Sequence, residues 1–159
     1  QRVMQRSRDI EPRADLIDHV FRFGSADDLA VAGDFNGDGI ATPGTFSAGR
    51  WHLDMNGDGA LNSQDDRSVD FGEAGDLPLV GDFDGDGVDE LAIVRGDLVI
   101  VDSNNNGHHD ATDQVFQLQS SDGTVIVGDF DGDGIEEPAL HQTATQQMPA
   151  PLTAQRKAS

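Results

Sequence analysis

The feature that most constrains this chain is a loop sequence that occurs three times. Gly33 begins GDFNGDGIAT, Gly81 begins GDFDGDGVDE and Gly128 begins GDFDGDGIEE, at spacings of 48 and 47 residues. A period of this length is typical of repeat proteins, in which each repeat is one unit that buries its apolar face against its neighbours. We therefore interpret the 159-residue chain as an array of repeats.

Each period also contains four short stretches of alternating apolar and polar residues, separated by glycine-rich or acidic turns, which predicts four β-strands per repeat. Segments of 18 residues that begin at Asp18, Asp66 and Asp113 align without a gap and end in the recurring loop. The prediction is an all-β protein of propeller-blade-like repeats of about 47–48 residues, with the loops between strands. The chain divides into an N-terminal arm with the closing half of a repeat, two complete repeats, the opening half of another and a flexible Thr/Gln/Ala/Pro-rich tail: 1–28, 29–75, 76–123, 124–140 and 141–159.

The recurring loop carries acidic or amide residues at alternate positions and a glycine at its sixth position. Carboxylates this close together repel one another, and a cation between them removes the repulsion. Calcium takes six to eight oxygen ligands, with side chains at positions 1, 3 and 5 and a carbonyl at position 7, and the glycine permits the sharp turn. At position 9 the first loop has Thr42 instead of Glu, so we expect it to bind more weakly. The predicted ligands are Asp34, Asn36 and Asp38; Asp82, Asp84, Asp86 and Glu90; and Asp129, Asp131, Asp133 and Glu137.

A second kind of acidic loop follows the second hairpin of each complete repeat. Its residues fall at positions 1, 3, 5, 6, 9 and 12 of a twelve-residue calcium loop, although no helical pattern flanks it. We therefore predict calcium loops set between strands. The predicted ligands are Asp54, Asn56, Asp58, Asn62 and Asp65 in one repeat, and Asp102, Asn104, Asn106, Asp110 and Asp113 in the next.

The sequence GDFDGDGVDELAI and its two sister loops resemble the FG-GAP/VCBS-type repeats of integrin-like β-propellers found in bacterial extracellular proteins. The resemblance covers about Leu29 to Leu140. It implies one calcium ion in each D-x-[DN]-x-D-G-x-x-[DE] loop. The twelve-residue loops resemble those of dockerins, a family in which helices flank the loops.

The charge distribution excludes several classes of partner. The formal net charge is −20, and residues 24–140 contain 26 acidic side chains against three Arg. Such a surface repels nucleic acid and anionic membranes. The chain has no run of about 20 apolar residues that would insert into a bilayer. Because weak calcium loops stay filled at extracellular calcium concentrations, we expect an extracellular or cell-surface location.

No set of catalytic residues is recognisable, and we expect no enzymatic activity. The five His residues lie in unrelated places, and His108 and His109 are expected to face solvent. Phe35, Phe83 and Phe130, at position 2 of the recurring loops, are expected to point inward, and Trp51 is expected to pack in the core or at its rim rather than at a sugar-stacking site.

These features predict an extracellular calcium-binding β-repeat protein with a structural or adhesive, self-assembling role. Complementary half-repeats at the two ends suggest strand pairing between copies, which would give a homo-oligomer, either a ring or a filament. A glycan or a surface ligand is a further possible partner. Two alternatives are a calcium-dependent lectin that uses exposed aromatic residues such as Trp51, and an accessory module of a polysaccharide-degrading enzyme.

Overall fold

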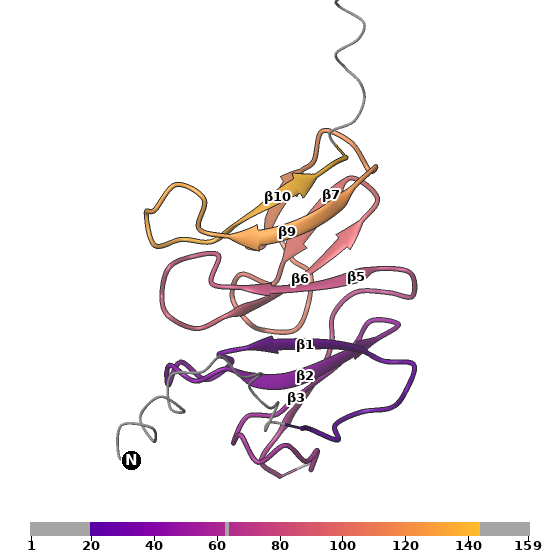
Figure 1. Ribbon diagram of the computed structural model, residues 1–159, viewed down its shortest axis with the longest axis vertical. Helices are drawn as coiled ribbons and strands as arrows, with labels where there is room; N and C mark the ends of the chain where they lie inside the picture. Colours follow the sequence, from indigo (N-terminus) through magenta and orange to yellow (C-terminus); the bar gives the residue numbers. More distant parts are fainter. Residues whose placement is uncertain (1–19, 63, 144–159) are drawn as a thin grey trace, which may run out of the picture.

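The computed structural model describes residues 20–62 and 64–143, which form ten β-strands (Figure 1). The described residues contain no helix, and therefore none that could cross a membrane. Most of the predicted N-terminal arm and tail lies outside the described residues. The strands are β1 (Leu29–Gly33), β2 (Thr42–Ser47), β3 (Arg50–Leu53), β4 (Arg67–Asp70), β5 (Leu77–Gly81), β6 (Glu90–Arg95), β7 (Leu98–Val101), β8 (Gln114–Gln117), β9 (Thr124–Gly128) and β10 (Glu137–His141).

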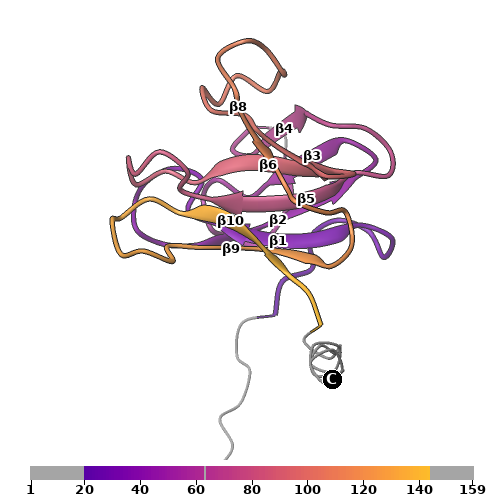
Figure 2. The ribbon, with the colours of Figure 1, turned by 90° about the horizontal axis from the view of Figure 1, so that it is seen from above.

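The strands form three antiparallel sheets, each built from strands that are consecutive in the chain. The first has the order β1-β2-β3-β4, the second β5-β6-β7-β8, and the third consists of β9 and β10. The sheets stack in chain order, with β5 packed between β1 and β9 (Figures 1 and 2). The all-β prediction is confirmed. Residues 20–22, which the alignment matches to parts of β4 and β8, form no strand.

Local sequence explains the tight hairpin in each complete repeat. Ala48 and Gly49 join β2 to β3, and both have positive φ angles, 48° and 90°. A two-residue turn with both φ angles positive matches the twist of the strands it joins. Between β6 and β7 the turn begins at Gly96, with φ at 62°. Each hairpin therefore has a glycine at a position that the turn requires.

The first hydrophobic core lies between the first and second sheets. Trp51 is completely buried, its Nε1 donates a hydrogen bond to the carbonyl of Phe71 at 2.8 Å, and its ring meets Phe46 edge to face with centroids 4.9 Å apart. Leu91 and Ile93 of the second sheet complete the cluster. Trp51 is thus a core residue, as predicted.

A second core lies between the second and third sheets. Phe83, Val99 and Val101 are buried there, with Val125 and Val127 of β9 packed against them. The inward orientation predicted for Phe35 and Phe83 is confirmed. For Phe130 it is wrong: its side chain is 55% exposed, because no described sheet covers that side of β9 and β10.

Hydrogen bonds also connect the recurring loops of successive repeats. The backbone N–H of Asp34 donates to Asp89 Oδ2 at 2.8 Å, and the N–H of Asp89 donates to the carbonyl of Asp34 at 2.9 Å. Asp82 and Glu136 make the same reciprocal pair at 2.8 and 2.9 Å. In both junctions position 8 of one loop binds position 1 of the loop before it.

Candidate metal-binding loops

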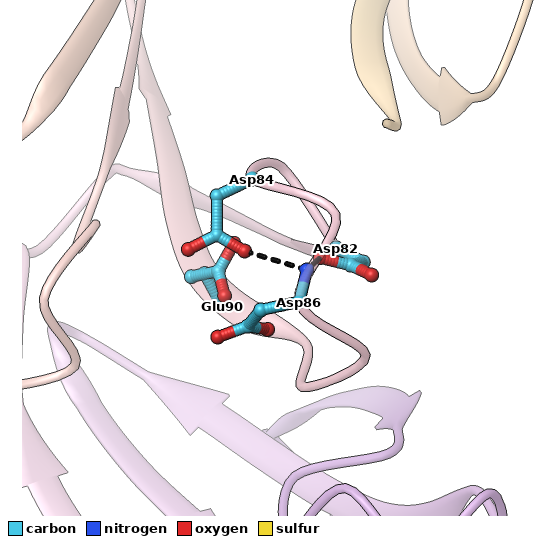
Figure 3. Close-up of side chains that lie close together, drawn as sticks. All are labelled: Asp82, Asp84, Asp86 and Glu90. Carbon is cyan, nitrogen blue, oxygen red and sulfur yellow. Dashed lines mark hydrogen bonds between the residues drawn. The ribbon is translucent and has the colours of Figure 1, made fainter. Parts of the chain in front are cut away.

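The strongest candidate site is the loop between β5 and β6. Asp82, Asp84, Asp86 and Glu90 each offer an oxygen atom, and these atoms lie within 4.8 Å of one another (Figure 3). The three Asp come from the loop, and Glu90 is the first residue of β6. The structure therefore brings together all four ligands predicted for this loop.

Backbone hydrogen bonds hold these Asp side chains turned into the loop. Asp82 Oδ1 accepts from the N–H groups of Gly85 and Asp86 at 2.7 and 3.1 Å, and its Oδ2 accepts from Gly87 at 2.9 Å. The N–H of Asp86 also bonds Asp84 Oδ1 at 3.0 Å (Figure 3). Gly85 and Gly87 have φ angles of 81° and 90°, which other residues adopt rarely.

The burial of Glu90 distinguishes this loop from the other two recurring loops. Its side chain is buried, Oε2 accepts from the N–H of Phe83 at 2.8 Å, and Oε1 has no hydrogen-bond partner in the described structure. Burial, together with the neighbouring Asp84, Asp86 and Asp82 carboxylates, raises the pKa of Glu90 to about 8. An unpartnered buried carboxylate oxygen is costly unless a cation meets it. The donor set, entirely of oxygen atoms, suits a hard divalent cation.

The third recurring loop brings three of its four predicted ligands together at the surface. Asp129, Asp131 and Glu137 form an acidic group, and Glu137 Oε1 accepts from the N–H of Phe130 at 3.1 Å. Asp133 bonds within the loop, where its Oδ1 accepts from the N–H of Ile135 at 2.9 Å. Unlike Glu90, Glu137 is only partly buried. The same residue types therefore form a more solvated site.

The first recurring loop has the same backbone arrangement with fewer carboxylates. Asp34 accepts from the N–H groups of its loop, and the N–H of Asp38 bonds Asn36 Oδ1 at 3.0 Å. The Asn36 amide donates to the carbonyl of Met55 at 3.0 Å, and the Thr42 hydroxyl donates to the carbonyl of Asp54. Asn36 and Thr42 therefore tie this loop to the next acidic loop.

In the acidic loop that follows β3, the structure gathers Asp54, Asp58 and Asp66. The predicted position-12 ligand, Asp65, is exposed and is not part of this group. Asp66 instead accepts from the N–H groups of Met55 and Asn62 at 3.0 and 2.8 Å. The Asn62 amide oxygen accepts from Gln64 and Asp65, and Asn56 bonds Asp58.

Sequence reasoning could have found Asp66. The gapless 18-residue alignment matches Asp66 to Asp113, and the structure gives both residues the same role. Asp113 accepts from the N–H groups of Ser103 and Asp110 at 3.1 and 2.9 Å. The twelve-residue spacing selected Asp65 because this loop is one residue longer than its counterpart.

In the acidic loop that follows β7, side-chain amide groups make many of the hydrogen bonds. Asp102 is fully buried, and burial raises its pKa. Asn104 and Asn106 donate side-chain N–H groups to Asp110 Oδ2 at 3.3 and 2.7 Å. Hydrogen bonds from Thr112, and then from these amides, lower the pKa of Asp110.

His108 and His109, in the same loop, are exposed, as predicted. The His109 ring Nδ1 lies 3.3 Å from Asp113 Oδ2.

Sequence reasoning also missed Asp89 and Glu136, the position-8 acids that bond the preceding loop. A usable signal was present, because position 8 is acidic in the second and third repeats and is Ala41 in the first.

Comparison of the chain with protein-family models, with curated proteins and with solved structures returned no match.

Proposed function

We propose that this chain is a calcium-stabilised β-repeat protein with a structural or adhesive role, whose sheets are arranged as propeller-type blades. The observation that carries the proposal is the buried, unpartnered Oε1 of Glu90 among three aspartates. Asp82, Asp84, Asp86 and Glu90 would hold the ion. When bound, the ion supplies the positive charge that compensates these four carboxylates.

The position of the loops supports a structural role for the ion. The loop at Asp82 joins β5 to β6 and is hydrogen-bonded to the next repeat through Glu136. An ordered loop therefore fixes both a hairpin and the junction that follows it. Repeat proteins are stabilised by such nearest-neighbour contacts, so an ion in each loop would strengthen the whole array.

An extracellular or cell-surface location agrees with this chemistry, because calcium is abundant there and the solvated third site would stay filled. The aromatic residue named for the lectin alternative, Trp51, is not available to bind a sugar. Trp51 is fully buried, and its indole N–H bonds a backbone carbonyl, so the ring has no face available to a sugar.

Calcium binding can be tested by thermal unfolding and titration calorimetry in calcium, in magnesium and in EDTA. A site with free calcium at about ten times its Kd gains about 1.4 kcal/mol, so several sites shift the midpoint by many degrees. We expect Glu90→Gln to remove the tightest binding step. Glu73→Gln changes an exposed glutamate outside the loops and is the matched control. An identical midpoint in calcium and in EDTA would refute the proposal.

A further inference from the structure

The junction between the first and second repeats depends on two glycines of the first loop. A Cβ atom added to Gly33 would lie 2.5 Å from Val80 Cγ1 and 2.9 Å from Asp89 Oδ2. A Cβ atom added to Gly37 would lie 2.9 Å from Val88 Cγ2. Such distances are too short for real contacts, so the second repeat packs directly on these glycines.

The junction between the second and third repeats is built from the equivalent residues. A Cβ atom on Gly81 would lie 2.7 Å from Val127 Cγ1 and 2.9 Å from Glu136 Oε1. On Gly85 it would lie 3.0 Å from Ile135 Cγ1. Two independent junctions thus show the same pattern: an aliphatic residue before the loop, an aliphatic at position 7 and an acid at position 8, all packed on glycines.

The third repeat carries the same receiving surface, but in the described structure nothing packs on it. We call Ile126, Gly128, Phe130 and Gly132 the acceptor face. A Cβ atom on Gly128 would meet only the ring of Phe130, and one on Gly132 would meet nothing within 4 Å. Ile126 and Phe130 are 44% and 55% exposed, whereas their counterparts Val31 and Phe35 pack in the first core.

The first repeat carries the complementary surface on the opposite side of the stack. Ala32, Ile40 and Ala41, here called the donor face, occupy the positions of Val80, Val88 and Asp89. Ile40 is 64% exposed. Ala32 and Ala41 line an apolar cavity of about 310 Å³, together with Phe21, Phe23 and Thr45. Both halves of the repeat-to-repeat junction are therefore present on one chain.

We propose that the acceptor face of one chain binds the donor face of a second copy, continuing the stack head to tail. The internal junctions fix the geometry, with Ile40 of one copy packed on Gly132 of the other. Ala32 and Ala41 provide neither the valine contact nor the acid that caps the loop N–H. The contact is therefore weaker than the internal ones and reversible. This inference deepens the proposed structural role but does not depend on calcium binding.

The test is sedimentation velocity of the full chain over a range of protein concentrations, in calcium and in EDTA. We expect the wild type to associate weakly, and Ala32→Val with Ala41→Asp to strengthen association at least tenfold. Ile126→Glu should abolish it, because the charged side chain would be buried without a partner against the apolar donor face of the second copy. Gln114→Glu adds the same side chain on β8, away from both faces, and is the control.

A complementation experiment distinguishes head-to-tail association from other modes of self-association. Ile126→Glu disables the acceptor face and Ile40→Glu disables the donor face. Each variant alone should be monomeric, and an equimolar mixture should form a dimer that does not grow further. A mixture that stays monomeric, or a double Ala32→Val/Ala41→Asp variant that associates no better than the wild type, would overturn the inference. Calorimetric calcium binding of the same samples shows whether the proposed metal function stands or fails separately.

Discussion

Arg95 and Asp76 form a two-point ion pair that links the end of β6 to the turn before β5. Arg95 Nε and Nη2 donate to Asp76 Oδ1 and Oδ2 at 2.8 and 2.6 Å, and the N–H of Glu73 donates to Oδ2 at 2.7 Å. The Asp76 side chain is buried, and its bonds with Arg95 lower its pKa. Removing one partner would leave a buried charge without compensation.

We expect Arg95→Gln to reduce the free energy of unfolding by about 1.5–3 kcal/mol, the range for hydrogen bonds to charged groups. Arg50 pairs with Asp70 at 2.8 Å, but both side chains are more than half exposed. Arg50→Gln should therefore change stability by less than about 1 kcal/mol. Urea unfolding of both variants measures the difference. Equal losses would show that burial of Asp76 has no energetic consequence.

Trp51→Phe should be destabilising although it preserves an aromatic ring. The variant removes the indole N–H and leaves the buried carbonyl of Phe71 without its donor, which costs about 1–3 kcal/mol. The smaller ring adds a cavity cost of similar size. Urea unfolding followed by circular dichroism measures the loss. His52→Ala, the next residue in β3 and partly exposed, is the control, and a Trp51→Phe loss no larger than that of the control would contradict this account.

The repeated loop allowed the sequence to predict the all-β fold and the grouping of the four acidic side chains at Asp82, because their spacing is strict. The packing between repeats was harder to predict from the sequence. Phe130 has the same sequence context as Phe83, yet it is exposed, since its environment depends on a neighbouring sheet and not on its own loop. Likewise, Asp89 and Asp34 are 55 residues apart, and only the stacking of the sheets brings them together.

The stability of the calcium-free protein should fall as pH rises. Glu90 has a pKa of about 8 in the folded chain and about 4.5 when unfolded, so between these values the folded state retains a proton that the unfolded state has lost. The free energy of unfolding therefore decreases by up to about 1.4 kcal/mol per pH unit through this window.

Urea unfolding in EDTA between pH 5 and 8 measures this dependence. Glu90→Gln should flatten the slope and should be more stable than the wild type at neutral pH without calcium. The order should reverse in calcium, because only the carboxylate binds the ion. Glu73→Gln should follow the wild type under both conditions. A slope that is the same for the wild type and Glu90→Gln would contradict the burial effect.

The bond between Asp89 and Asp34 predicts that a change in one repeat loosens the loop of the repeat before it. Asp89→Ala removes the acceptor of the Asp34 N–H, which should cost about 1–2 kcal/mol. Asp34 in turn holds the N–H groups of Gly37 and Gly39 at 2.7 and 2.8 Å, so these two amides should exchange their hydrogens faster. Asp97→Ala, in the exposed turn between β6 and β7, is the control.

Glu136→Ala should have the same effect one repeat further along, on the loop with the strongest candidate site. Glu136 Oε1 accepts from the N–H of Asp82, which orients the first ligand of that loop. The amides of Gly85 and Gly87 should then exchange faster, and calcium affinity at this loop should fall several-fold although none of its ligands has changed. Hydrogen exchange and calorimetry on the same variant test both effects. Faster exchange confined to the loop of Glu136 itself would show that the loop of one repeat does not depend on the repeat that follows it.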